Sequence, residues 1–327
     1  MPKVECMCKT IVTVSNFEFK PFHIDAKPLI DSYTKPWEAE CSDLSFANLF
    51  IWGTEGKMEY AEKDNMLFIR LRFAGVPMFF WAPIPKFGVK VDYRKGVYEA
   101  IAYMRLMGVE PTFRSVAKPF YDMMQEACPE LYILPTDVAW DYVYEKEQMK
   151  TLAGKKLHGK RNHINKFLSL YPEYEYRKLD ASMIDDCMSL YEFWISEKEQ
   201  PAIELMDEKK SVQLALDHME ALGLVGGAIY VENKLIAFTL GERLQKHMQL
   251  IHIEKADYRY DGIFPMINQQ YVLHECDDVE LINREEDMGI EGMRRAKRSY
   301  NPTKMIEKFV FSVKDLTGMD IWKEEME

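Results

Sequence analysis

The sequence predicts an α+β protein made of two tandem domains that share one architectural plan. Its 327 residues are enough for two domains of ordinary size, each with its own hydrophobic core. Hydrophobic residues make up 47% of the chain, with 18 Tyr and 18 Phe, which is typical of a packed globule. In each half, helical patterns and hairpin-linked strands alternate in a similar order. We place the boundary near Glu145, within about ten residues either way.

The first half, residues 1–144, is predicted to form helices around an antiparallel meander. Hairpin chemistry at Lys63–Asn65 and Ala74–Gly75 links three of its strands, and Gly108 ends its longest helix. The predicted helices are Asp25–Lys35, Ser45–Trp52, Tyr93–Met107 and Lys118–Ala127. The predicted strands are Lys57–Glu62, Met66–Arg72, Pro77–Ala82, Thr112–Val116, Leu131–Leu134 and Trp140–Tyr144.

The second half, residues 145–313, repeats the plan, and a charged tail at 314–327 is expected to be mobile. A hairpin through Glu232–Lys234 joins two strands, and Gly223 ends a helix. The predicted helices are Glu145–Leu152, Lys156–Tyr171, Ser182–Glu197, Asp207–Leu222, Phe264–His274 and one that opens within Asn283–Pro302. The predicted strands are Glu173–Leu179, Gly226–Val231, Leu235–Leu240, Met248–Lys255, Asp278–Ile282 and Met305–Val313.

Bulk properties exclude several classes of protein. A net charge of −11 argues against binding nucleic acid through the overall field, although it leaves room for a local basic groove. The six cysteines lack metal-type spacing, so we expect no metal site. The longest apolar run, Val76–Ile84, is too short and too broken by proline to cross a bilayer. We therefore expect a cytoplasmic protein, a monomer or a weak dimer, with reduced thiols.

The stretch Asn283–Pro302 (NREEDMGIEGMRRAKRSYNP) changes sign along its length. Acidic residues come first, basic residues follow, and Tyr300 closes the run. This order complements a helix macrodipole, and Ile290, Met293, Lys297 and Tyr300 recur at helical spacing. One interpretation is a well-capped amphipathic helix with a half-buried tyrosine; the other is a functional motif.

Three motifs together carry a family resemblance. They are the stretch above, GKKLHGKRNHINKF at Gly154–Phe167 and YPEYEYRKL at Tyr171–Leu179. Over roughly Asp25 to Val313 the chain resembles an uncharacterised bacterial family grouped with the C-terminal domain of phosphatidylglycerol lysyltransferase. That family is similar to the Fem-type aminoacyltransferases and, more remotely, to the GCN5-related N-acetyltransferases (GNAT).

The resemblance implies a fold and a division of labour. It implies two tandem acyl-CoA N-acyltransferase-like (GNAT-like) domains, each a mixed, mostly antiparallel sheet flanked by helices. Residues 145–313 would hold the donor and catalyse the reaction. Residues 1–144 would serve as a scaffold or as the wall of an acceptor site.

A candidate phosphate loop lies at Arg259–Phe264. GCN5-related enzymes wrap the pyrophosphate of coenzyme A in a loop with the pattern R-x-x-G-x-G/A. Arg259 and Gly262 match this pattern, whereas Phe264 replaces its last small residue. A helix N-terminus offers unpaired amides to an anion. The alternative is a simple turn at Asp261–Gly262.

Tyr300 is the first catalytic candidate. Many related acetyltransferases carry a Tyr at this place, which protonates the departing thiolate, and a phenol is a usable acid for that step. The general base would be a carboxylate; Glu285 and Asp287 are favoured because they lie in the motif, with Glu242 and Glu254 as further candidates. Each of these residues also has a structural interpretation, as a buried tyrosine or as an acid at a helix start.

Two basic clusters on an acidic chain suggest a seat for a polyanion. The first contains Lys155, Lys156, His158, Lys160, Arg161, His163 and Lys166, and the second runs from Arg294 to Arg298. From these clusters we take Lys160, Arg161, Arg295 and Arg298, with Arg259 and Gly262, as candidate cofactor-binding residues. A solvated helix face is the alternative interpretation.

Of three possible functions we favour the first, and the other two are alternatives. The first is an acyltransferase that moves an acyl group from a coenzyme A thioester to an amine or hydroxyl by direct attack, with basic groups stabilising the oxyanion. The second is an aminoacyltransferase with an aminoacyl-tRNA donor. The third is a non-catalytic anion- or nucleotide-binding protein on the same fold.

Overall fold

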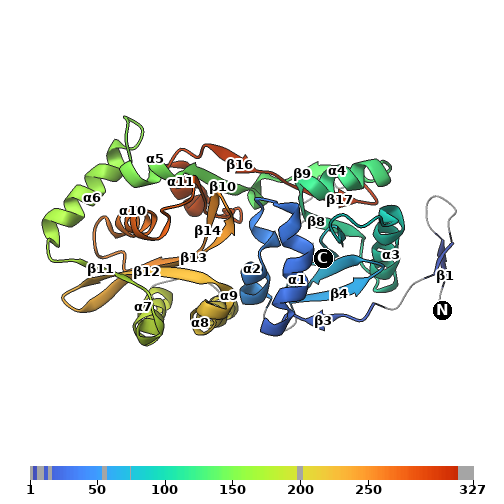
Figure 1. Ribbon diagram of the computed structural model, residues 1–327, viewed down its shortest axis with the longest axis horizontal. Helices are drawn as coiled ribbons and strands as arrows, with labels where there is room; N and C mark the ends of the chain where they lie inside the picture. The colour runs from blue at the N-terminus through green and yellow to red at the C-terminus, as the bar shows by residue number, and fades with distance from the viewer. Residues whose placement is uncertain are drawn as a thin grey trace. The chain divides into compact units, whose positions relative to one another are not determined.

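A computed structural model describes residues 3–5, 11–13, 17–53, 57–73, 75–196 and 202–315. Most of the predicted tail, 314–327, and the end of the predicted helix at Glu197 lie outside these ranges. By its internal contacts the chain divides into two compact units, Met1–Ala139 with Glu307–Glu327, and Trp140–Ile306. Each unit contains a mixed sheet with flanking helices (Figure 1). The predicted α+β class is therefore confirmed.

The first unit is built around an eight-stranded sheet. Its path is β3-β4-β5-β6-β8-β17-β9, with β7 paired to β5, and all pairs are antiparallel except β6 with β8. The strands are β3 Lys20–Pro21, β4 Met58–Lys63, β5 Met66–Leu71, β6 Phe79–Phe80, β7 Ile84–Pro85, β8 Thr112–Ala117, β9 Tyr132–Pro135 and β17 Lys308–Ser312. The helices are α1 Lys27–Thr34, α2 Phe46–Trp52, α3 Tyr93–Leu106 and α4 Lys118–Ala127. A separate hairpin joins β1 Lys3–Glu5 to β2 Ile11–Thr13.

The second unit is built around a seven-stranded sheet with the order β11-β12-β13-β14-β15-β10-β16. Only β14 and β15 run parallel among its described pairs. The strands are β10 Asp141–Glu145, β11 Glu175–Lys178, β12 Leu224–Val231, β13 Lys234–Gln245, β14 Met248–Ala256, β15 Leu281–Asn283 and β16 Lys304–Ile306. The helices are α5 Lys146–Thr151, α6 His158–Leu170, α7 Ile184–Ser196, α8 Ala202–Asp217, α9 Met219–Leu222, α10 Ile263–Glu275 and α11 Glu291–Arg298.

Helices cover both faces of this second sheet (Figure 1). Helix α10 packs on β12 and β13 with α5 and α6 beside it, whereas α7 packs on β13 and β14 from the other side. The core on the α10 side includes Phe167, Ile267 and Tyr271, all fully buried. Ile164 and Phe167 on α6, and Leu157 just before it, are buried, as the helical periodicity predicts.

Two of the predicted elements differ from the structure in a way that matters for the site: one helix starts later than expected, and one strand is two strands. The motif does not open directly into a helix, because 284–290 form a loop in which Glu285, Met288 and Gly289 adopt positive φ angles. Helix α11 then spans only Glu291–Arg298. The predicted last strand, Met305–Val313, is two strands: β16 pairs with β10, while β17 lies between β8 and β9 of the other sheet.

Candidate active site

The candidate site lies where the two parallel strands of the second unit part. Strand β14 pairs with β15 from Met248–Leu281 to Leu250–Asn283, and beyond this point it continues to Ala256 paired with β13 only. The next residue after β15 is Arg284, and its Nη2 donates to Oε2 of Glu254 on β14 at 3.1 Å. An ion pair thus spans the opening between the two strands.

Tyr300 is a buried residue next to this ion pair. It is 4% exposed, and its ring meets Tyr144 of β10 edge-on, with 6.2 Å between the ring centroids. The backbone is fixed because the Tyr300 amide donates to the Lys297 carbonyl at 3.2 Å and its carbonyl accepts from the Gln148 amide. Two cations approach the ring: Lys160 Nζ lies 4.2 Å from the centroid and Arg284 Cζ lies 5.1 Å from it. Such contacts are cation–π interactions.

Burial and charge set the acidity of these groups. Burial raises the pKa of Tyr300 well above its usual range, although the Arg284 guanidinium opposes this. Burial, together with repulsion from Arg284, lowers the pKa of Lys160, and Glu254 opposes this shift. The site therefore holds a tyrosine that keeps its proton and a lysine whose ammonium is destabilised.

Lys297 of α11 holds the loop that carries Arg284. Its Nζ donates to the Arg284 carbonyl at 2.6 Å and also to the Glu286 carbonyl. Burial lowers the pKa of this lysine. Because the loop has no helical hydrogen bonds of its own, these two contacts fix the direction in which Arg284 leaves the strand.

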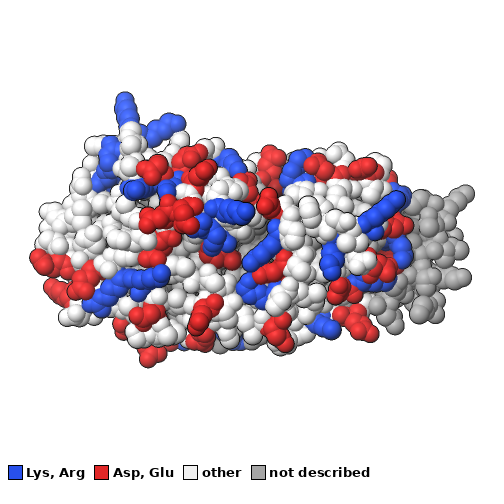
Figure 2. Space-filling view, in the orientation of Figure 1, with Lys and Arg blue, Asp and Glu red and all other residues white. Residues whose placement is uncertain are grey.

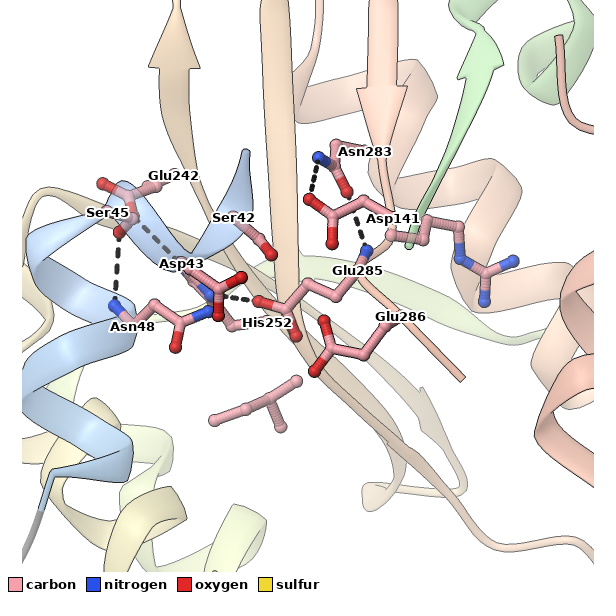
Figure 3. Close-up of polar contacts among 12 residues, drawn as sticks. Ser42, Asp43, Ser45, Asn48, Asp141, Glu242, His252, Asn283, Glu285 and Glu286 are labelled. Carbon is pink, nitrogen blue, oxygen red and sulfur yellow. Dashed lines mark hydrogen bonds and ion pairs between the residues drawn. The ribbon is translucent and has the colours of Figure 1, made fainter. Parts of the chain in front are cut away.

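Next to the pair lies a second polar group, centred on His252 of β14 (Figure 3). Its fully buried ring contacts Glu285 through Nδ1 at 2.8 Å and Glu242 through Nε2 at 2.9 Å. Although burial alone would lower the pKa of His252, hydrogen bonds to the two carboxylates outweigh it and raise the pKa to about 10. Burial raises the pKa of Glu285, and the His252 contact opposes this. Glu285, predicted as a base, is thus one of two carboxylates that pair with the buried His252 ring.

Asp287, the other predicted base, is enclosed by donors. It accepts from Tyr142 at 2.6 Å, from the Gly289 amide at 2.9 Å and from Arg294 Nε at 2.8 Å. Burial would raise its pKa, but these hydrogen bonds hold the pKa below its usual value. Its contacts suit an anchor for the 284–290 loop better than a base that must accept a proton.

The predicted phosphate loop is occupied by contacts within the protein. Arg259 Nε and Nη2 donate to the two oxygens of Asp257 at 2.8 and 2.6 Å, and its guanidinium stacks on Phe193 with Cζ 4.0 Å from the ring centroid. Asp257 is fully buried, so withdrawal of Arg259 would weaken the neutralisation of a buried carboxylate. Gly262 does adopt φ +86°, but the space beside its Cα is filled by the His163 carbonyl of α6.

The predicted basic residues separate into distinct roles. Lys160 lies in the site, whereas Arg161 donates to the carbonyls of Leu152 and Gly154 and so caps the end of α5. Arg295 and Arg298 are exposed on α11. Figure 2 shows lysine and arginine side chains gathered at the projecting turn between α5 and α6.

The fold thus brings Tyr300, Lys160 and Glu254 together and leaves Asp287, Arg259 and Gly262 in other surroundings. Sequence reasoning missed Arg284 and His252. Arg284 stands inside the motif, between Asn283 and Glu285, but no spacing rule distinguishes it from its neighbours. A histidine between Ile251 and Ile253, in the apolar part of its strand, was the available signal for His252.

Within the described residues, no cluster of His, Cys, Asp and Glu has the composition to hold a metal ion. Across those same residues, none of the helices combines the length and the apolarity that crossing a membrane requires.

The structure has the predicted α+β architecture, with two mixed sheets that are each flanked by helices. The chain belongs to the family described as phosphatidylglycerol lysyltransferase, C-terminal, whose model matches residues 35–312. This confirms the family resemblance on which the sequence prediction rests.

Individual relatives agree with this assignment. A conserved protein of unknown function from Bacteroides thetaiotaomicron is 30% identical, with a TM-score of 0.80 over 91% of this chain and 100% of that one. The L-PGS of Bacillus licheniformis is 11% identical, with a TM-score of 0.60 over 88% of this chain and 93% of that one, which shows a shared fold. An uncharacterised protein of Mycoplasmoides gallisepticum is 26% identical over 53% of this chain, and the match spans 56% of that relative's length.

Proposed function

We propose that the protein is an aminoacyltransferase, which moves an aminoacyl group from an aminoacyl-tRNA ester to an amine or hydroxyl acceptor. Membership of the phosphatidylglycerol lysyltransferase family supports an aminoacyl donor. The observation that carries this choice over a coenzyme A thioester is the ion pair of Arg259 with the buried Asp257.

A pyrophosphate needs a free cation and open amides, and this loop offers few of either. Arg259 is engaged, and the Ile263 amide donates to the Tyr260 carbonyl. Pro265, in the first turn of α10, has no amide proton. The residues of this loop therefore fit the pyrophosphate of coenzyme A poorly.

The proposed reaction is a direct attack without a covalent enzyme intermediate. The acceptor nitrogen or oxygen bonds to the ester carbonyl carbon, and the bond from that carbon to the terminal ribose oxygen breaks. Glu254 accepts the proton of the nucleophile, Tyr300 donates a proton to the ribose oxygen, and both groups return to their starting states by exchange with solvent.

This role suits the properties of the Tyr300 hydroxyl. Among the described residues it makes no hydrogen bond, so it can turn toward a substrate. With its raised pKa the phenol stays protonated until a strongly basic alkoxide forms.

Binding and transfer assays test the proposal. Radiolabelled total aminoacyl-tRNA would be incubated with the protein and a mixture of amino acids, short peptides and phospholipid vesicles. We expect label on one acceptor class, and tRNA binding that weakens steeply as salt rises from 50 to 200 mM, as phosphate contacts require. Binding and turnover of acetyl-coenzyme A, without tRNA binding, would favour the thioester donor instead.

Replacement of Tyr300 by Phe should lower the transfer rate by roughly 10²–10⁴-fold, because the general acid is lost. Stability should change by less than about 0.5 kcal/mol, since the hydroxyl makes no hydrogen bond to the described residues. Tyr132→Phe, at an exposed tyrosine of the first unit, is the matched control and should leave the rate unchanged. A fully active Tyr300→Phe protein would remove the acid role and favour a binding protein.

A further inference from the structure

The side chains around Tyr300 carry more positive than negative charge. Lys160 from α6 and Arg284 from the loop after β15 both lie near the ring, and Glu254 on β14 is the carboxylate that pairs with Arg284. The other polar groups close to them are the Tyr144 hydroxyl, which donates to the Lys297 carbonyl, and the Tyr300 hydroxyl. Two cations therefore face one carboxylate in a partly desolvated place.

One donor in this group is buried and unused. Arg284 Nη1 has no hydrogen-bond partner in the described part of the chain, although Nη2 of the same guanidinium is bonded to Glu254. A buried donor without a partner carries a substantial desolvation penalty, so such groups call for an explanation. Arg284 is held in this state because Lys297 fixes the backbone on which it stands.

Lys160 is the second unused donor. It forms no hydrogen bond or ion pair with any described residue, and its ammonium rests on the Tyr300 ring at 4.2 Å. The neighbouring Lys156, by contrast, bonds to Asn301 at 2.8 Å, and Lys166 pairs with Asp261. Because Lys160 lies beside another cation and forms no ion pair with a described residue, it can bind an anion that comes from outside the protein.

We propose that Lys160 and Arg284 bind one monoanionic oxyacid group of a substrate beside the Tyr300 ring. A carboxylate or a phosphodiester has the single charge that would balance the group and two oxygens for two donors. The assignment to a substrate rests on the proposed transfer reaction. In that reaction an amino-acid or peptide acceptor would supply a carboxylate, whereas a lipid or the tRNA backbone would supply a phosphodiester.

The test measures anion binding without any donor. The thermal midpoint of the full chain would be followed with sodium acetate or sodium dimethyl phosphate, with sodium chloride at equal ionic strength as reference. We expect one of the two anions to raise the midpoint by roughly 3–6 °C at ten times its dissociation constant. The anion that does so identifies the source of the group. A second readout is the NMR titration of the Lys160 side chain, whose pKa should rise when the anion binds.

Lys160→Met is the main variant, and Lys155→Met, which removes an exposed lysine from the same basic cluster, is its matched control. The first should abolish the anion-dependent shift and should change the stability of the free protein little, because Lys160 makes no hydrogen bond or ion pair with a described residue and methionine can keep its packing on the Tyr300 ring. The control should keep the shift. Arg284→Met should also abolish it, but this variant leaves Glu254 without its partner, so its folding must be checked separately.

The outcomes separate this inference from the proposed function. An equal response of the wild type and Lys160→Met to both anions, or no response of either, would overturn the anion site even if aminoacyl transfer is observed. Saturable anion binding that depends on Lys160 would support the site even if no tRNA-dependent transfer is found, in which case the proposed function alone would fail.

Discussion

His252 makes the stability of the folded protein depend on pH. Its folded-state pKa of about 10 lies above the ordinary value of 6.5, because the contacts with Glu242 and Glu285 outweigh the cost of burial. A raised pKa contributes stability that is complete below about pH 6.5 and declines as the pH rises through about 10.

His252→Gln should therefore destabilise the protein by roughly 3–5 kcal/mol at pH 6, because the buried imidazolium that pairs with both carboxylates is lost. The difference from wild type should shrink between pH 7 and pH 10, and urea unfolding at several pH values measures it. His158→Gln, at an exposed histidine of α6, is the control and should change stability by less than about 0.5 kcal/mol. A pH-independent difference would contradict the imidazolium assignment.

At the scale of elements, the contact between α10 and α6 depends on one glycine. A Cβ at Gly262 would lie 2.2 Å from the His163 carbonyl oxygen and 3.1 Å from Phe167 Cβ, and the backbone there has φ +86°. Both the close approach and the left-handed backbone exclude a side chain. The sequence pointed to this glycine for its possible contact with phosphate, whereas helix packing accounts for it without a ligand.

Gly262→Ala should accordingly destabilise the second unit by more than about 1 kcal/mol, because strain and overpacking add. Gly292→Ala is an informative counterpart, since Gly292 lies in α11 and nothing would lie within 4 Å of its Cβ. That change should stabilise the protein by about 0.5–1 kcal/mol. Chemical denaturation of both variants gives the comparison, and a neutral Gly262→Ala would show that α6 can move away.

At the scale of the whole chain, the last described strand belongs to the first unit. Strand β17 lies between β8 and β9, and the buried Lys308 pairs with Asp43 at 2.6 Å. A chain that ends after Ile306 would leave two strands without their shared partner and would lose the Lys308–Asp43 ion pair.

Such a truncation should therefore loosen the first unit and spare the core of the second. Hydrogen exchange followed by mass spectrometry should show faster exchange in Thr112–Ala117, whereas Leu224–Val231 in the second sheet should keep the protection of the full-length chain. Equal protection of β8 in both proteins would contradict the importance of this pairing.

Local sequence determined the α+β class and most helices and strands, because periodicity and turn chemistry act over a few residues; the family followed from the resemblance of three motifs. The hairpin at Glu232–Asn233 is an example, since both residues adopt the positive φ that such turns require. The inward face of α6 followed in the same way from spacing alone.

The tertiary structure alone decided which partners those residues have. In the folded protein Lys160 of α6 lies on the ring of Tyr300. Arg259 pairs with Asp257, Arg294 pairs with Asp287, and β17 joins the sheet of the first unit. The sequence could not show these choices, because a charged side chain pairs with whichever opposite charge the fold brings near, whether close along the chain, as for Arg259 and Asp257, or far from it, as for Lys308 and Asp43. Strand pairing is likewise a long-range choice, and it decided that Arg284 would stand at the opening between β14 and β15.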